Sequence, residues 1–290
     1  TLQSGHVSEA WDIYRNRIGG GRNLIWRLGA YERGERICRA FAGGRGIGVL
    51  PVSAPPSDRQ AAEATAFPWQ SLPEVMQAIF INEWAVYLHS LGRLAAAARC
   101  HEFHLAAELK RKDWRNASAT NQNLSAVWLL SGRLTAGQAT AAEALRLAEI
   151  ARTAETRRNS HARHAHAHAL RGEVPSALAD FRAALDWQHK AEGDNDQPLY
   201  SVGGIWHTHL LARLGRRDEA TRLTEANRSI CETAFSAGEP SGPKCNLILS
   251  DLHREAGDLA QAETLHALAH DWAVARDAKE VRCWAALVEV

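Results

Sequence analysis

The sequence has little of several features that would point to a particular class of protein. Met76 is the only methionine among 290 residues, and 34 basic side chains nearly balance 33 acidic ones. Balanced charge argues against a duplex nucleic-acid binder, which needs a basic stripe to displace counterions. No apolar run approaches the roughly 18 to 20 residues of a membrane span, and no signal peptide opens the chain. We therefore expect a cytoplasmic protein that binds neither nucleic acid nor membranes.

Motifs for catalysis and cofactor binding are also missing. The five cysteines are scattered without a C-x-x-C pair, which indicates reduced thiols. There is no G-x-S-x-G, and the run Gly19-Gly20-Gly21 is followed by neither Lys-Ser nor Lys-Thr, so it is not a phosphate loop. We expect no catalytic residue and no cofactor in this chain.

What the sequence does contain is a repeated turn. A glycine is followed by an apolar residue two places on and a small residue five places on, and Gly215 keeps only the small residue, Ala220. From Gly92 onward the turn glycines are 40, 40, 43 and 42 residues apart. Each interval fits two helices of roughly 15 to 18 residues with short turns. Glycine permits positive φ at the turn, and the small residue lets the two helices approach. The complete signature occurs at Gly5, Gly92, Gly132, Gly172 and Gly257.

This repeat predicts an all-α, right-handed solenoid of stacked antiparallel helix pairs. We expect imperfect units over residues 1–41, with a turn at Gly34, and a Gly/Pro-rich connection over 42–73 with one helix at 58–66. A regular array over 74–276 and a capping helix over 277–290 follow. The chain begins at Thr1, and the helix after Gly5 lacks its expected partner. We therefore expect a fragment of a longer polypeptide.

The segments Leu91–Ala97 (LGRLAAA) and Ala256–Ala262 (AGDLAQA) carry a resemblance to the tetratricopeptide repeat (TPR) superfamily, in its version with repeats of about 40 residues. Such long repeats look like the C-terminal arrays of bacterial signal-transducing NTPases with numerous domains, the STAND class. The resemblance implies a sensor array that recognises a peptide, protein or small-molecule inducer in its concave groove. It implies a role, and no individual ligand residue.

In this scaffold the first helix of each pair lines the groove. Side chains four and eight residues before the turn glycine pack on the second helix, so the opposite face should bind the partner. Amide side chains there would hold a peptide backbone, and charged side chains would hold its ends. The alternative is that these are ordinary solvated residues. The expected groove residues are Asn82, His89, Gln122, Asn159, His166, His209, Arg213, Lys244, Asp251 and Arg254.

Histidines suggest two further hypotheses. His166 and His209 occupy the same position in successive units, so they could form a pH-sensitive or anion-binding patch with Arg213. His161, His164 and His168 share a helical face, and His164 and His168 have the i, i+4 spacing of a zinc-binding helix. However, His164 and His168 fall at the packing positions, with no nearby cysteine and no H-E-x-x-H motif. We therefore expect neutral histidines hydrogen-bonded in the helix interface, and no metal.

Trp84, Trp128 and Trp206 are expected to fill the packed helices rather than to bind a ligand. The sequence thus favours a non-catalytic sensor region of a larger bacterial signalling protein. One alternative is a stand-alone adaptor that holds two proteins together. The other is an enzyme with an unusual active site in a helical solenoid, which would show titratable groups converging in a closed pocket.

Overall fold

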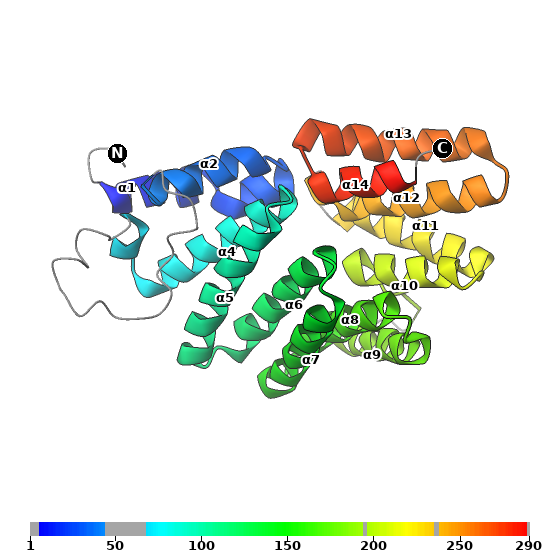
Figure 1. Cartoon of the computed structure of the whole chain (residues 1–290), viewed down its shortest axis with the longest axis horizontal. Coiled ribbons are helices and arrows are strands. Elements are labelled where there is room, and N and C mark those ends of the chain that lie inside the picture. Colours follow the sequence, from blue (N-terminus) through cyan, green and yellow to red (C-terminus); the bar gives the residue numbers. More distant parts are fainter. Residues whose placement is uncertain (1–5, 44–67, 194–195, 235–237, 289–290) are drawn as a thin grey trace.

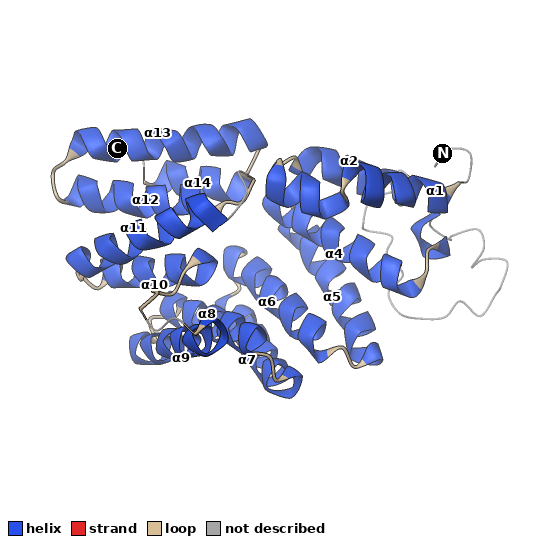
Figure 2. Ribbon diagram, turned by 180° about the vertical axis from the view of Figure 1, so that it is seen from behind, coloured by secondary structure: helices blue, strands red, loops and turns tan. Residues whose placement is uncertain are grey.

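The structure is a computed structural model that describes residues 6–43, 68–193, 196–234 and 238–288. Within these ranges the regular elements are all helices (Figures 1 and 2). The turn expected at Gly5 and the helix expected at 58–66 lie outside the described residues. The five cysteines form no disulfide. No helix of the described part is both long and apolar enough to cross a membrane.

Over residues 74–276, apart from the undescribed 194–195 and 235–237, five antiparallel helix pairs follow one another, and each pair packs on the next. This arrangement confirms the prediction of an all-α solenoid. The pairs are α4 (Glu74–Ser90) with α5 (Leu94–Arg111), α6 (Trp114–Leu130) with α7 (Leu134–Ala151), α8 (Ala154–Leu170) with α9 (Val174–Glu192), α10 (Ser201–Arg213) with α11 (Arg217–Ala234), and α12 (Ser241–Glu255) with α13 (Leu259–Arg276); a single helix, α14 (Lys279–Leu287), packs on the last pair.

The turn glycines have the conformation that the signature requires. At the first turn Gly92 has φ of 71°, and the amide of Arg93 donates to the carbonyl of Leu88. This is the left-handed glycine cap that ends a helix and reverses the chain. The small residues five places later are buried between the paired helices. At Gly137 a methyl group would lie 2.5 Å from Leu129 Cδ2, so a larger residue there would force the Leu129 side chain to move.

The N-terminal segment departs from the repeat. It comprises α1 (Val7–Asp12), which continues as a π-helix (Ile13–Ile18), a second π-helix (Arg22–Arg27) and α2 (Tyr31–Phe41). Gly19, with φ of 89°, ends the first π-helix. The turn expected at Gly34 is wrong, because Gly34 lies inside α2. A Cβ atom there would lie 2.1 Å from Cε1 of Tyr87, so this glycine admits the aromatic ring of α4 instead of reversing the chain.

The array bends until its two ends meet. Figures 1 and 2 show α2 beside α13 and α14, although these helices are far apart in sequence. The hydroxyl of Tyr31 donates to the carbonyl of Gly238 at 3.3 Å, and the Arg276 side chain packs on Gly29. One hydrophobic core contains both Trp11 of α1 and Ala273 of α13. The first helices of the pairs therefore face an interior shared with α14, not the open side of a free ribbon.

Candidate functional site: the inner groove

A pocket of about 400 Å³ opens where α6, α8 and α10 face the interior. Two of the expected groove residues, Gln122 and Asn159, line it. The chain between α9 and α10 closes one side with Leu199 and Tyr200. The remaining lining residues are Asn123, Arg158, Ala162, Arg163, Ser201, Val202, Gly203 and Trp206.

Arg163 and His166 of α8 lie against the indole of Trp206 from α10. The guanidinium carbon of Arg163 is 4.0 Å from the centre of that ring, and the His166 imidazole stacks on it at 4.5 Å with an interplanar angle of 3°. Arg163 forms no ion pair among the described residues, and its Nε has no hydrogen-bond partner there. Burial lowers the pKa of Arg163 to about 9, so the side chain stays charged at neutral pH. The nearby carboxylate of Glu280 partly offsets the effect of burial. The pocket therefore holds a cation that is fixed on an aromatic surface and makes no close ion pair among the described residues.

Side-chain amides lie beside this cation. The amide nitrogen of Gln122 donates to the hydroxyl of Ser160 at 2.8 Å, which fixes its orientation. The carbonyl oxygen of Asn159 accepts from Nε of Arg158 at 3.1 Å. The amide nitrogen of Asn159 has no partner within the described part of the chain. Because peptide groups of a ligand need both donors and acceptors, these amides suit a polypeptide backbone.

Helix α14 covers another part of the interior. Lys244 is only 6% exposed, and its ammonium lies 2.6 Å from the carboxylate of Glu280. Burial would raise the pKa of Glu280, but the charge of Lys244 and the nearby His89 and Arg163 lower it. Burial lowers the pKa of His89 itself, and its Nε2 has no hydrogen-bond partner among the residues that the structure describes. Two of the expected groove residues, His89 and Lys244, thus surround a carboxylate of the chain's own last helix.

The other expected residues are spread more widely. Asn82 is half-buried in α4, and Arg213 is exposed at the end of α10. His209 lies 5.5 Å from the Trp284 ring of α14. Asp251 and Arg254 form an ion pair with each other on the surface of α12. None of these five side chains, which come from α4, α10 and α12, lines the pocket between α6, α8 and α10.

The histidine patch differs from the expectation. Burial lowers the pKa of His166 well below its usual value, and the nearby Arg163 adds to this effect. Burial also lowers the pKa of His209, with Arg213 contributing. Both imidazoles are therefore neutral at neutral pH, and the positive charge next to His166 belongs to Arg163.

Arg163 and Trp206 lie outside the groove face that the repeat predicts. Both lie nine residues before a turn glycine, Gly172 and Gly215, and the expected groove positions do not include that place. Trp206 packs against the hydrophobic core as expected, but it is only half-buried and also lines the pocket, whereas Trp84 is fully buried. The signal that could have identified these two pocket residues is the presence of an arginine and a tryptophan at the same position of successive repeats.

No family model matches the chain, and no curated protein matches it in sequence. A Rap protein in complex with Competence and Sporulation Factor has a TM-score of 0.58 at 11% identity, over 95% of this chain and 79% of that one. BtubC (BKLC) from P. vanneervenii has a TM-score of 0.52 at 14% identity, over 86% of this chain and 92% of that one.

A putative kinesin light chain from Podosopora anserina, with nearly identical TPR-like repeats, has a TM-score of 0.46 at 16% identity. The match covers 70% of this chain and 97% of the kinesin light chain structure. Identities this low concern the fold alone. With its stacked helix pairs and glycine turns, the chain has the fold of the TPR-like helical solenoids.

Proposed function

We propose that this chain is a non-catalytic sensor region that binds an extended polypeptide segment carrying an acidic group. The supporting observation is the pocket between α6, α8 and α10. There the guanidinium of Arg163, which makes no close ion pair among the described residues, lies on the Trp206 ring beside the amide nitrogen of Asn159. Helical repeat proteins of this kind use their inner surface to hold other chains.

Each group of pocket residues would bind a different part of the polypeptide. A guanidinium is a planar donor that matches a carboxylate with two parallel hydrogen bonds. Stacking on Trp206 already restricts Arg163, so less side-chain entropy is lost when the carboxylate binds. The amides of Gln122 and Asn159 would hydrogen-bond the backbone of the bound segment. Trp206 and Leu199 offer apolar contact to a neighbouring side chain.

The sensor role in a bacterial STAND-type parent is part of the same proposal. Binding in the interior would favour one of two arrangements of a neighbouring ATPase, by no more than the difference in affinity for the two arrangements. Reading the coding sequence upstream of Thr1 tests this part. A nucleotide-binding domain encoded there supports it, whereas its absence favours the stand-alone adaptor.

The binding itself can be tested with pools of short fluorescent peptides of randomised sequence that differ only in net charge. We expect fluorescence polarisation to show saturable binding of the acidic pool and none of the basic pool. Loss of a charge-assisted hydrogen-bond pair costs about 1.5–3 kcal/mol. Arg163→Ala should therefore weaken binding by about tenfold or more.

The matched control is Arg182→Ala, because Arg182 is an exposed arginine on α9 away from the pocket. It should leave the affinity unchanged. Equal binding of acidic and basic pools, or equal losses in the two arginine variants, would refute a site centred on Arg163.

A further inference from the structure

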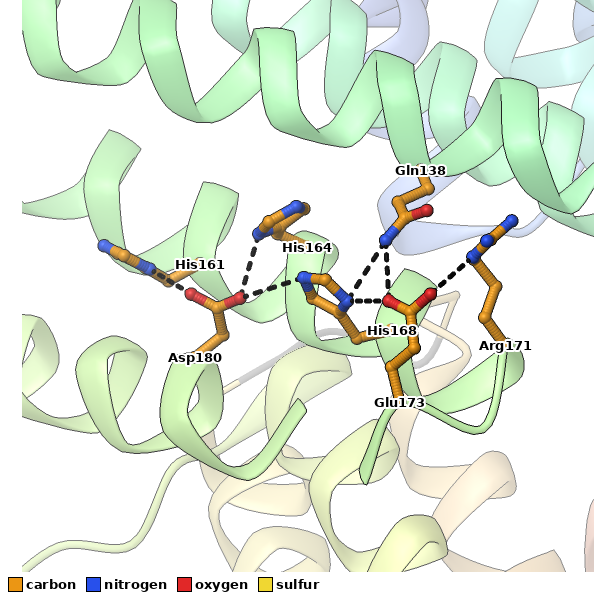
Figure 3. A network of polar contacts seen from close by, with 7 residues as sticks. All are labelled: Gln138, His161, His164, His168, Arg171, Glu173 and Asp180. Atoms are coloured by element: carbon orange, nitrogen blue, oxygen red, sulfur yellow. Dashed lines mark hydrogen bonds and ion pairs between the residues drawn. The ribbon is translucent and has the colours of Figure 1, made fainter. Parts of the chain in front are cut away.

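A second polar cluster lies between α8 and α9, and Figure 3 shows its members. Asp180 of α9 reaches toward three histidines of α8. Its Oδ1 lies 2.8 Å from Nδ1 of His161, and its Oδ2 lies 2.9 Å from Nδ1 of His164 and 3.8 Å from Nε2 of His168. The rings of His164 and His168 are 4.3 Å apart. Two imidazoles and one carboxylate oxygen therefore converge on one point.

We propose that His164, His168 and Asp180 form a binding site for a divalent transition-metal ion, with zinc as the best fit. One donor atom from each residue lies within 4.8 Å of the other two. Zinc bonds of about 2.0–2.2 Å in a tetrahedron place two donors roughly 3.3 Å apart. The observed spacings of 2.9 and 3.8 Å from Oδ2 of Asp180 bracket that value. Small side-chain rotations are therefore enough to hold the ion.

The surroundings orient the ligands as a metal site requires. Nδ1 of His168 lies 2.5 Å from Oε2 of Glu173, so this nitrogen donates its proton there and Nε2 keeps a free lone pair. Glu173 is fixed in turn by Nε of Arg171 at 2.9 Å and by the amide of Gln138 at 2.8 Å. Carboxylates that bind the second nitrogen of a histidine are typical partners of zinc ligands. The second oxygen of Asp180, Oδ1, is held by a hydrogen bond with Nδ1 of His161.

Comparison with the last helix pair shows which part of the cluster is special. His253 and Asp258 lie at the same places around Gly257 as His168 and Glu173 around Gly172, and they too are paired, at 3.2 Å. The places of His164 and Asp180, however, are taken there by Leu249 and Leu265, which are buried. The histidine–acid pair across the turn thus recurs as a structural contact. The α10–α11 pair has a histidine, His207, at the place of His164, but Leu223 at the place of Asp180. Only the α8–α9 pair therefore has both additional donors, at two positions that the last pair fills with leucines.

The site is accessible and separate from the inner groove. The side chains of His164, His168 and Asp180 are 14–18% exposed, so an ion can enter and a water molecule can complete its coordination. His166 points instead to Trp206 in the groove. A bound ion would link α8 to α9 within one helix pair, and its bonds to His164 and Asp180 would replace the hydrogen bond between them.

The test uses the full chain prepared without a histidine tag and titrated with zinc against a chromophoric chelator. We expect one zinc ion per chain, and cobalt substitution should give the visible absorption bands of tetrahedral cobalt. His168→Ala and Asp180→Asn should each weaken zinc binding at least tenfold, and Glu173→Gln should weaken it by about 10- to 100-fold. The matched control, His253→Ala, should change nothing.

A second variant guards against loss of folding. His164→Leu combined with Asp180→Leu copies the leucine pair of the last hairpin, so it removes two ligands while preserving a packing that this fold already uses. Its circular dichroism should match that of the wild type, and its stoichiometric zinc binding should be gone. Absence of one tight zinc ion in the wild type, or its retention in this double variant, would overturn the proposal.

Discussion

Replacing His101 with leucine should stabilise the protein, and more so in acid than at neutral pH. His101 of α5 is 0% exposed, and neither ring nitrogen has a hydrogen-bond partner within the described part of the chain. An unsatisfied buried polar group costs about 1–3 kcal/mol, and leucine of similar volume removes that cost. At pH 8 we therefore expect a gain of about 1 kcal/mol.

The pH dependence follows from the environment of the same ring. Burial lowers the pKa of His101 from 6.5 to about 3, with the neighbouring His89 and His104 adding to the effect. Below pH 6.5 the unfolded chain binds a proton at this residue and the folded chain does not, so stability falls as the pH falls toward 3. At pH 5 this loss amounts to about 2 kcal/mol.

Urea unfolding followed by circular dichroism at pH 8 and pH 5 measures both effects. Other buried histidines also lower the stability of the wild type in acid, but they are shared with the variant and cancel in the difference. The leucine variant should be about 3 kcal/mol more stable than the wild type at pH 5. A stability difference that is the same at both pH values would show that the folded protein does not hold His101 neutral.

Three further substitutions test the packing. Gly34→Ala should cost about 1–3 kcal/mol in urea unfolding, because the added methyl group overlaps the rigid ring of Tyr87. Gly172→Ala should cost only about 1–2 kcal/mol, since nothing lies within 4 Å and the strain comes from φ of 78° alone; a larger loss would point to a contact that this turn does not have. Tyr14→Phe should cost about 1.5–3 kcal/mol by thermal or urea denaturation, because the Tyr14 hydroxyl donates to the buried carboxylate of Glu83 at 2.5 Å; an unchanged midpoint would contradict this hydrogen bond.

The repeat was predictable because its signals are local. A glycine such as Gly132 and the small residue Gly137 lie within one turn of the hairpin, so their spacing alone indicates the reversal and the close approach of the helices. Gly34 shows the limit of such reasoning. Its role depends on Tyr87, which comes from another helix and cannot be identified from the neighbouring sequence.

The two proposed binding sites, like the role of Gly34, depend on contacts between different helices. The histidines of α8 were visible as a spaced group, but the ligand that completes them, Asp180, comes from α9. Likewise Arg163 is part of a site only because Trp206 of the next pair lies over it. Periodicity indicates which face of a helix is packed, but it does not show which neighbouring side chain meets it.

The contact between the first and last helices also affects how the protein unfolds. In a linear repeat array each unit is supported only by its neighbours, so terminal units fray first and unfolding can spread in steps. Here Tyr31 and Gly29 at one end are joined to Gly238 and Arg276 at the other. Neither terminus is then a free starting point for melting, and the chain should lose its structure in a single concerted transition.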